Sequence, residues 1–400
     1  MKVATILENN IDVGGGYTMA LSSLIQIDGY LKKNNIEHNI YVYTKNNLTI
    51  LQSFNISAHL LKYNFLNKIF SYYNFSLFAL YFQSKFQFLS NLEKKLISDK
   101  VDLVNFVTTS PTPFVLQKLN YIFTVMDICH RDYPEFAEVK DFNIFRKREM
   151  LLQECLAPAT IIITESEELR DKISLKYSID KKRVINIPNY ISPFIINQNF
   201  SEKEINEVQN KYLLPKSFFF YPAQFWGHKN HIRIIEAVNI LKKKDKEFSV
   251  IFCGSDKGNL SYIRNEIKKH NLENNIKILG FISTKELSIL YKLSFAVIMP
   301  TFFGPTNIPV VEAWYYNIPL IYSSHLKNQV EDAALLVDPL NSKDIAEKME
   351  EICIENVRLN LIQNGKKKLE DLKKSRELGY LTFIEKLKLF DYMRKCWTSE

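Results

Sequence analysis

Thr306, Asn307 and Glu312 form the most chemically informative group of side chains in this chain of 400 residues. They follow the apolar run 295–299, which has the composition of a buried parallel strand, and a Gly-Pro turn. The residues after the turn can begin a helix, so free backbone N–H groups and the positive helix end would lie beside them. A carboxylate there can accept hydrogen bonds from a ribose diol, while Thr306 and Asn307 can bind sugar or phosphate. A sugar-nucleotide site is therefore the first hypothesis.

Lys229 is the basic residue best placed to bind a diphosphate. It follows the predicted strand 217–221 and precedes a predicted helix, so it would lie at the strand-end crevice of a parallel sheet. Gln224 on the same loop adds a neutral hydrogen-bond donor. The alternative for Lys229 is a solvated loop residue. His231 is expected to pack or cap and not to act in catalysis.

Asp127 and His130 are the candidate catalytic residues of the first half of the chain. They directly follow the predicted strand 121–125, which would place them at the edge of the sheet. Three positions apart, they could share one helix face and orient an acceptor hydroxyl or take its proton. The structural alternatives are a helix cap for Asp127 and packing of His130 on Tyr133.

Small-residue turns follow three of the predicted strands. Glycines 14–16 follow strand 3–7, Gly254 ends strand 249–253, and Gly280 precedes Phe281 and Ile282. Glycine lets the backbone approach a ligand without a Cβ in the way. Each turn alone is weak evidence, and their order and spacing ahead of Glu312 give them weight.

Strands alternate with helices along the whole chain, which predicts the α/β class with parallel, doubly wound sheets. The predicted strands are 3–7, 39–43, 101–107, 121–125 and 160–164, then 217–221, 249–253, 276–279, 295–299 and 320–322. The polar stretch 188–199, with two prolines, separates two similar halves. We expect an N-terminal Rossmann-like domain at 1–192, a C-terminal Rossmann-like domain at 200–374, and a helix at 375–400 that packs back toward the N-terminal domain.

Net charge, cysteine spacing and the distribution of apolar residues limit the classes of function that fit this chain. The 52 basic and 44 acidic residues give a net charge of +8, too mild to indicate nucleic acid but compatible with anionic substrates or an anionic membrane surface. The five cysteines are far apart, which favours a reducing compartment. No signal peptide or stretch of 18 uncharged apolar residues is evident, so a cytoplasmic protein is expected. The aromatic segment 60–92 could pack in the core or touch an anionic membrane.

These motifs together resemble those of the retaining glycosyltransferases of family 4, also called glycosyl transferases group 1, which have the GT-B fold of two Rossmann-like domains facing a cleft. Members carry two glutamates separated by seven residues around a Phe-Gly-hydrophobic-Pro turn. Glu312 occupies the second position and Gly304 the first, so one glutamate is missing. Members also place a basic residue five positions ahead of a lysine, and here Gln224 precedes Lys229. The resemblance covers nearly the whole chain.

The resemblance also implies roles for the remaining residues. Gly254 would border the nucleotide, Phe281 and Ile282 would flank its base, and Gly15 and Gly16 would lie near the transferred group. Amides of residues 306–308, including Ile308, would bind the donor beside Lys229 and Gln224. Asp127 and His130 match a family pattern in which a His-Asp pair is followed by a second histidine, but Met126 stands in place of the first.

The implied activity is that of a hexosyltransferase. It would transfer a sugar, with retention of anomeric configuration, from a nucleotide-diphosphate donor to a hydroxyl of a glycan acceptor in surface polysaccharide or lipopolysaccharide synthesis. The acceptor would be lipid-linked, the enzyme cytoplasmic or peripheral on the membrane, and neither cofactor nor metal would be needed. The alternatives are a nucleotide-sugar epimerase of the same fold and a non-catalytic GT-B-like binding subunit.

Overall fold

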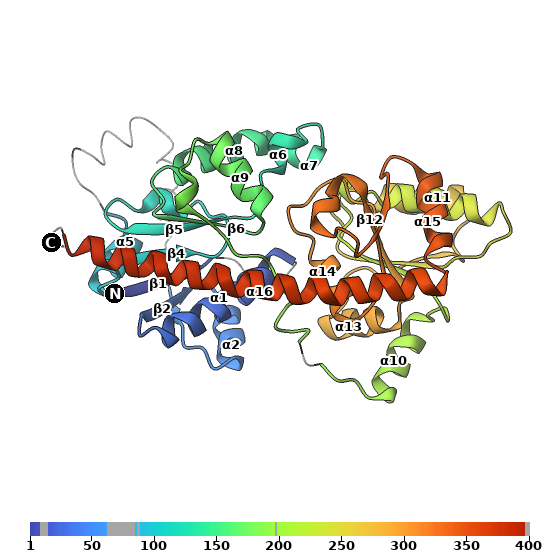
Figure 1. The fold of residues 1–400 in the computed structure, drawn as a ribbon, viewed down its shortest axis with the longest axis horizontal. Coiled ribbons are helices and arrows are strands. Elements are labelled where there is room, and N and C mark those ends of the chain that lie inside the picture. Colours follow the sequence, from blue (N-terminus) through green and yellow to red (C-terminus); the bar gives the residue numbers. More distant parts are fainter. Residues whose placement is uncertain (9–14, 62–84, 86–88, 197, 397–400) are drawn as a thin grey trace. The chain divides into compact units, whose positions relative to one another are not determined.

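The computed structural model describes residues 1–8, 15–61, 85, 89–196 and 198–396 (Figure 1). The chain forms two compact units. The first consists of Met1–Asp132, Asn143–Asn189 and Lys374–Glu400, and the second of Tyr133–Phe142 and Tyr190–Lys373. Most of the predicted membrane or core segment 60–92, together with Gly14, lies outside the described residues.

The first unit is built on a parallel sheet of seven strands in the order β3-β2-β1-β4-β5-β6-β7. Its strands are β1 (Lys2–Leu7), β2 (Glu37–Val42), β3 (His59–Leu60), β4 (Leu103–Phe106), β5 (Asn120–Val125), β6 (Ile161–Thr164) and β7 (Val184–Asn186). Apolar side chains bury both faces, as in Leu103, Val104 and Phe123, because helices cover each side. The chain winds outward from β1 and then from β4 in opposite directions, so the direction reverses between these two strands.

The helices of the first unit lie on both sides of this sheet, with α1 and α2 on one side and α8 and α9 on the other (Figure 1). They are α1 (Gly15–Lys33), α2 (Lys45–Ser53), α5 (Asn91–Ser98), α6 (Cys129–Asp132), α8 (Ile144–Leu156) and α9 (Glu167–Lys176). Side chains cap several of them: Ser90 Oγ accepts from Glu93 N at 3.0 Å, and Ser166 Oγ accepts from Leu169 N at 3.1 Å.

The second unit is built on a parallel sheet of six strands in the order β10-β9-β8-β11-β12-β13. Its strands are β8 (Phe219–Pro222), β9 (Val250–Cys253), β10 (Ile276–Ile278), β11 (Ala296–Met299), β12 (Leu320–Ser323) and β13 (Leu335–Val337). Here the winding direction reverses between β8 and β11. Loops that follow these two strands therefore lie at a topological switch point, where ligands of open α/β sheets bind.

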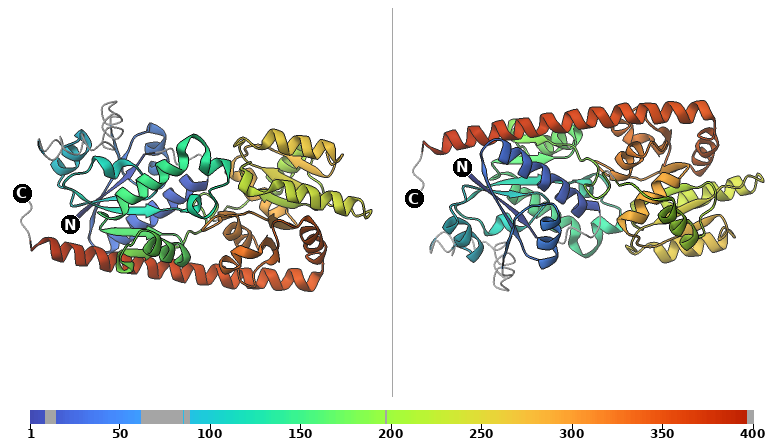
Figure 2. Two further views of the ribbon diagram at one scale, coloured as in Figure 1. Left: turned by 90° about the horizontal axis from the view of Figure 1, so that it is seen from above. Right: turned by 90° about the horizontal axis from the view of Figure 1, so that it is seen from below.

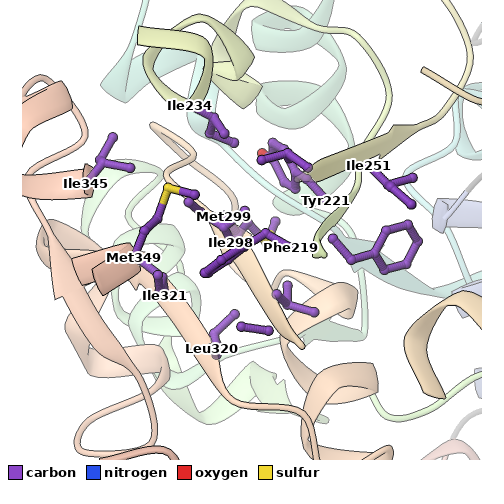
Figure 3. Packing of buried hydrophobic residues seen from close by; sticks show 14 of the residues in the cluster. Phe219, Tyr221, Ile234, Ile251, Ile298, Met299, Leu320, Ile321, Ile345 and Met349 are labelled. Atoms are coloured by element: carbon purple, nitrogen blue, oxygen red, sulfur yellow. The ribbon is translucent and has the colours of Figure 1, made fainter. Parts of the chain in front are cut away.

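A continuous apolar core holds the second unit together (Figure 3). Met299 of β11 and Ile321 of β12 pack with Ile345 and Met349 from the helix α15, all at most 1% exposed. The helices of this unit are α7 (Ala137–Lys140), α10 (Glu202–Tyr212), α11 (His231–Lys242), α12 (Leu260–Lys269), α13 (Thr284–Leu293), α14 (Ile308–Tyr315) and α15 (Ser342–Glu351). Removing such a fully buried side chain would cost about 2–5 kcal/mol.

The last helix, α16 (Glu355–Arg394), is one unbroken helix of 40 residues (Figure 2). The sequence predicts a helix over 375–400, so the observed helix begins 20 residues earlier than expected. Its later part belongs to the first unit. There the Arg376 guanidinium donates to Pro188 O at 2.6 Å, and the Tyr380 ring stacks on Tyr30 with centroids 4.9 Å apart.

The predicted strands are all confirmed to within a few residues, and three strands were not predicted. These are β3, β7 and β13, each of two or three residues at a sheet edge. The other difference is the segment Tyr133–Phe142, which lies in the first half of the sequence but packs in the second unit. Among the described residues, no helix has the length and apolarity needed to cross a membrane.

Candidate functional site

Lys229 and Asn307 meet at the switch point of the second unit. Lys229 follows β8 and Asn307 follows β11, and the Lys229 ammonium donates to Asn307 Oδ1 at 3.2 Å. Asn307 is the residue before α14, and its side chain does not cap that helix. The positive helix end and the lysine are thus adjacent, an arrangement that binds anionic groups such as a diphosphate.

A hydrogen-bond network fixes the Asn307 amide. Its Nδ2 donates to Tyr322 Oη at 2.6 Å, and the Tyr322 hydroxyl donates to Gln329 Oε1 at 2.8 Å. Gln329 Nε2 donates in turn to Gly304 O at 2.7 Å. Because Asn307 is 6% exposed and Tyr322 fully buried, these bonds hold the amide in one orientation and direct its oxygen at Lys229.

Gly304 cannot carry a side chain in this arrangement. Its φ of +145° is one that residues with a side chain rarely adopt. A Cβ built on it would lie 2.6 Å from Asn307 Oδ1 and 2.7 Å from Nδ2. The Asn307 amide therefore fills the space that a longer residue at 304 would need. This gives a physical reason why glycine stands at the first glutamate position.

Restoring a glutamate by Gly304→Glu is expected to damage the site. The clash displaces Asn307 from Lys229, so the free energy of unfolding should fall by about 2 kcal/mol or more and diphosphate binding should weaken. Urea denaturation and calorimetric titration with UDP and GDP measure both effects. Gly258→Ala is the control, since Gly258 also has a positive φ, +99°, but a Cβ added there would have nothing within 4 Å. Unchanged stability of Gly304→Glu would contradict this explanation.

Glu312 lies inside the second unit and not on its surface. It is 6% exposed, and its Oε2 accepts from the Tyr291 hydroxyl at 2.7 Å. Burial raises the pKa of Glu312 to about 7, against the lowering effect of that hydrogen bond. Its Oε1 has no hydrogen-bond partner among the described residues. A buried carboxylate with one unused oxygen could accept hydrogen bonds from a ribose diol, and the structure leaves this role a prediction.

The glycine turns of the second unit bring its strand ends together. Gly254, at φ +151°, lies so close to the loop after β8 that a Cβ would come within 2.4 Å of Ala223 O. Its N–H donates to Gly280 O at 2.8 Å. The next residue, Phe281, is 67% exposed, and Ile282 is half-buried beside it. Such an exposed aromatic ring at the strand ends is suited to stacking on a base.

The Gln224 side chain is held by its own loop, whereas the His231 side chain packs in the core. Gln224 Oε1 accepts from the Trp226 indole N–H at 3.1 Å, so the side chain is held by its own loop. His231 is fully buried and stacks on Phe225 with centroids 4.7 Å apart. Burial lowers the pKa of His231 to about 3, which keeps the ring neutral. His231 is thus a packing residue, as predicted.

In the first unit, Asp127 and His130 each contact α8. Asp127 Oδ1 accepts from the N–H of Cys129, the first residue of α6, at 3.0 Å and also pairs with the Arg148 guanidinium. His130 is fully buried, and its Nε2 lies 3.2 Å from Glu149 Oε2. Burial lowers the pKa of His130. The two side chains therefore have separate structural partners, and a catalytic role for them stays a prediction.

Glu8 is a polar residue at the first unit's switch point that was not predicted from the sequence. It directly follows β1, and its carboxylate accepts from Ser110 Oγ at 2.8 Å and from the Thr112 hydroxyl, both after β4. Burial raises the pKa of Glu8 to about 7. A carboxyl group with this pKa can exchange a proton at neutral pH. The sequence feature that could have identified Glu8 is its position directly after the predicted strand 3–7.

Two predicted features are only partly described. Gly15 and Gly16 are the first residues of α1. Thr306 is half-buried in the loop before α14, and Ile308 is the first residue of that helix. Within the described part of the chain, no group of three or more His, Cys, Asp or Glu side chains could hold a metal ion.

The chain has relatives of known activity. Residues 202–368 match the family model described as glycosyl transferases group 1. The O-antigen chain mannosyltransferase RfbU of Salmonella typhimurium is 25% identical over 226 residues, 56% of this chain and 58% of the relative. The O-antigen chain mannosyltransferase B of Escherichia coli is 24% identical over 243 residues, 60% of this chain and 62% of the relative. The matches span about three fifths of these relatives.

Solved structures match along nearly the full chain. A glycosyltransferase from Rickettsia africae superposes with a TM-score of 0.67 at 15% identity, covering 96% of this chain and 98% of that one. Anabaena Alr3699/HepE in complex with UDP-glucose superposes with a TM-score of 0.69 at 13% identity, covering 96% of this chain and 100% of that one. WaaG, a glycosyltransferase involved in lipopolysaccharide biosynthesis, superposes with a TM-score of 0.64 at 13% identity, covering 94% of this chain and 97% of that one.

At these identities the structural likeness shows the fold alone, and it is the fold of two Rossmann-like parallel-sheet units seen in GT-B glycosyltransferases. The family match covers the part of the second unit that holds Lys229, Gly304, Asn307 and Glu312. Residues 202–368 thus match the glycosyl transferases group 1 family model, in a chain with the GT-B fold.

Proposed function

We propose that this protein is a retaining glycosyltransferase of family 4. It transfers a hexose from a nucleoside-diphosphate donor to a hydroxyl of a lipid-linked glycan during lipopolysaccharide or surface polysaccharide synthesis, at the cytoplasmic face of the membrane. The observation that carries the proposal is the contact of Lys229 with Asn307 at the start of α14, at the switch point of the family-matched unit.

The donor would bind along the carboxyl ends of the second sheet. The diphosphate lies against Lys229, the amide of Gln224 and the N–H groups at the start of α14, the positive end of that helix. The ribose diol donates to Glu312, and the base lies by Phe281, Ile282 and the turn at Gly254. Each contact uses a polar or aromatic group at or near the strand ends of one sheet.

Departure of the diphosphate leaves negative charge on its oxygens. The Lys229 ammonium and the helix end can stabilise that charge at no cost of reorganisation, since Asn307 already holds the lysine in place. These groups supply the positive charge for which other transferases use a metal, and we propose that none takes part here. The acceptor hydroxyl loses a proton in the same reaction, and Asp127, His130 or Glu8 of the first unit could receive it.

The donor is identified by incubating the protein with UDP-, GDP-, ADP- and CMP-sugars, with and without glycan lipids extracted from bacterial membranes. We expect one nucleotide sugar to release its nucleotide faster when the lipid extract is present, with sugar incorporated into the lipid. A nucleotide sugar converted to its epimer without lipid would indicate the epimerase instead. Tight binding with no release from any donor would indicate a non-catalytic subunit.

A further inference from the structure

Glu138 belongs to the first half of the sequence, but it contacts the loop that carries Lys229. The segment Tyr133–Phe142 packs in the second unit, and Glu138 in its short helix α7 reaches His228, the residue before Lys229. Glu138 Oε1 accepts from the His228 backbone N–H at 2.9 Å and lies 2.6 Å from His228 Nδ1. One carboxylate oxygen therefore binds both the backbone and the ring of the same residue.

The opposite side of His228 is also fixed. Its carbonyl oxygen accepts from Phe302 N at 2.9 Å and from Thr301 Oγ1 at 3.2 Å, both in the loop after β11. The His228 ring stacks on Phe303, with centroids 4.0 Å apart and planes inclined by 13°. His228 thus joins the loop after β8 to the loop after β11, the two loops that carry Lys229 and Asn307.

Aromatic contacts attach the Glu138 segment to the same place. Tyr133 stacks on Phe303 at 5.2 Å, and Phe136 lies 5.3 Å from Phe303 and 5.4 Å from Phe302. The Glu138 and His228 side chains are 10% and 12% exposed, so the contact between them is largely shielded from water. Burial works to raise the pKa of Glu138, but the His228 hydrogen bonds outweigh it and hold the pKa below its ordinary value.

We propose that Glu138 is a positioning residue for diphosphate binding. By holding His228, it sets the place of Lys229 one residue further on, and so fixes the distance between the Lys229 ammonium and the start of α14. Glu138 itself does not touch the donor. This inference rests on the proposed function, and it adds a contribution of the first half of the sequence to the donor site of the second unit.

The inference predicts a selective loss of diphosphate affinity in Glu138→Ala. Isothermal titration of the full chain with UDP and GDP, and with uridine and guanosine, separates the diphosphate from the nucleoside. For the diphosphate that the wild type binds, we expect affinity to fall about tenfold, whereas nucleoside affinity should change by less than about twofold. Glu138→Gln keeps an Oε1 acceptor for both donors, so it should recover part of the loss.

Two further variants make the result specific. Glu135→Gln changes an exposed carboxylate in the same segment and should leave both affinities unchanged. Adding His228→Gln to Glu138→Ala should weaken diphosphate binding little more than the more severe of the two single changes does, because both changes act through one contact. Wild-type affinity in Glu138→Ala, or an equal loss for nucleoside and diphosphate, would overturn this inference alone. A wild type that binds no nucleoside diphosphate would overturn the proposed function and this inference with it.

Discussion

Glu312→Gln is expected to weaken nucleoside-diphosphate binding about 100-fold and, at the same time, to stabilise the unliganded protein at pH 8. The affinity falls because an amide replaces the buried carboxylate that we propose accepts from the ribose diol. The stability rises because the wild type must hold a charge at a position that is 6% exposed. The Tyr291 hydroxyl can still donate to the Gln oxygen, so the packing is retained.

The pH dependence follows from the direction of the pKa shift. Burial raises the pKa of Glu312 from its ordinary value of 4.5 to about 7. Between these values the folded protein binds a proton that the unfolded chain has released, so the free energy of unfolding falls as pH rises. Below pH 4.5 both states are protonated, and above pH 7 the loss is complete. The Gln variant lacks this loss and should be more stable by about 2–3 kcal/mol at pH 8.

Urea denaturation at pH 5 and pH 8 tests this stability effect. The two proteins should differ little at pH 5 and clearly at pH 8. The comparison isolates the effect of Glu312, because Glu8, whose pKa is also raised by burial, is present in both proteins. Binding should also release a proton near pH 6.5, since the diol favours the ionised carboxylate; calorimetry in buffers of different ionisation enthalpy measures it. An equal pH response of the two proteins would exclude a buried, titrating Glu312.

Lys229→Ala is expected to weaken nucleoside-diphosphate binding by about 10- to 100-fold with little effect on nucleoside binding. The change removes the proposed charged contact to the diphosphate and leaves the Asn307 oxygen without its ammonium donor. The fold should persist, because the Lys229 carbonyl, which accepts from the Tyr221 hydroxyl at 2.8 Å, is kept. Titration with UDP and GDP measures the loss.

The matched control for Lys229→Ala is Lys243→Ala. Lys243 is exposed at the end of α11, away from the strand-end loops of the sheet. This variant removes the same charge and should bind as the wild type does. A similar loss in both variants would mean that net charge, and not the position of Lys229, governs affinity.

Local patterns were enough to predict the fold and the strand-end position of Lys229 and Asn307. The apolar runs that became β8, β9 and β11 are buried on both faces, so composition alone identifies them as parallel strands. Lys229 and Asn307 follow two such runs, and parallel strands necessarily bring their carboxyl ends to one edge. Sequence order therefore sufficed to place both residues at that edge.

Contacts between residues distant in sequence could not be predicted in this way. Nothing near Glu138 indicates that it binds His228, 90 residues further on. The burial of Glu312 beside Tyr291 likewise depends on how α13 and α14 pack in the second unit. The strands β3 and β13 are short edge strands whose stability comes from the neighbouring strand and not from their own composition.

The sequence also could not explain Gly304. The missing glutamate was visible as a departure from the family pattern, but the sequence did not show that the Asn307 amide, fixed by Tyr322, fills the space that a side chain would occupy.

For Asp127 and His130, the sequence indicated a catalytic role but not the contacts that the structure shows. Their spacing suits catalysis, yet Arg148 and Glu149 of α8 pair with them in the structure. No motif in the sequence distinguishes these two partners from the other charged residues of that helix, so the pairing could not be predicted.

The binding of one nucleoside diphosphate by both Lys229 and Glu312 is central to the proposed function. Isothermal titration of the wild type, Lys229→Ala and Glu312→Gln with UDP and GDP, and with uridine and guanosine, tests it most directly. We expect that the wild type binds at least one of the two diphosphates, that Lys229→Ala weakens binding of the diphosphate but not of the nucleoside, and that Glu312→Gln weakens both. Unchanged affinity of both folded variants for the bound nucleotide would contradict it.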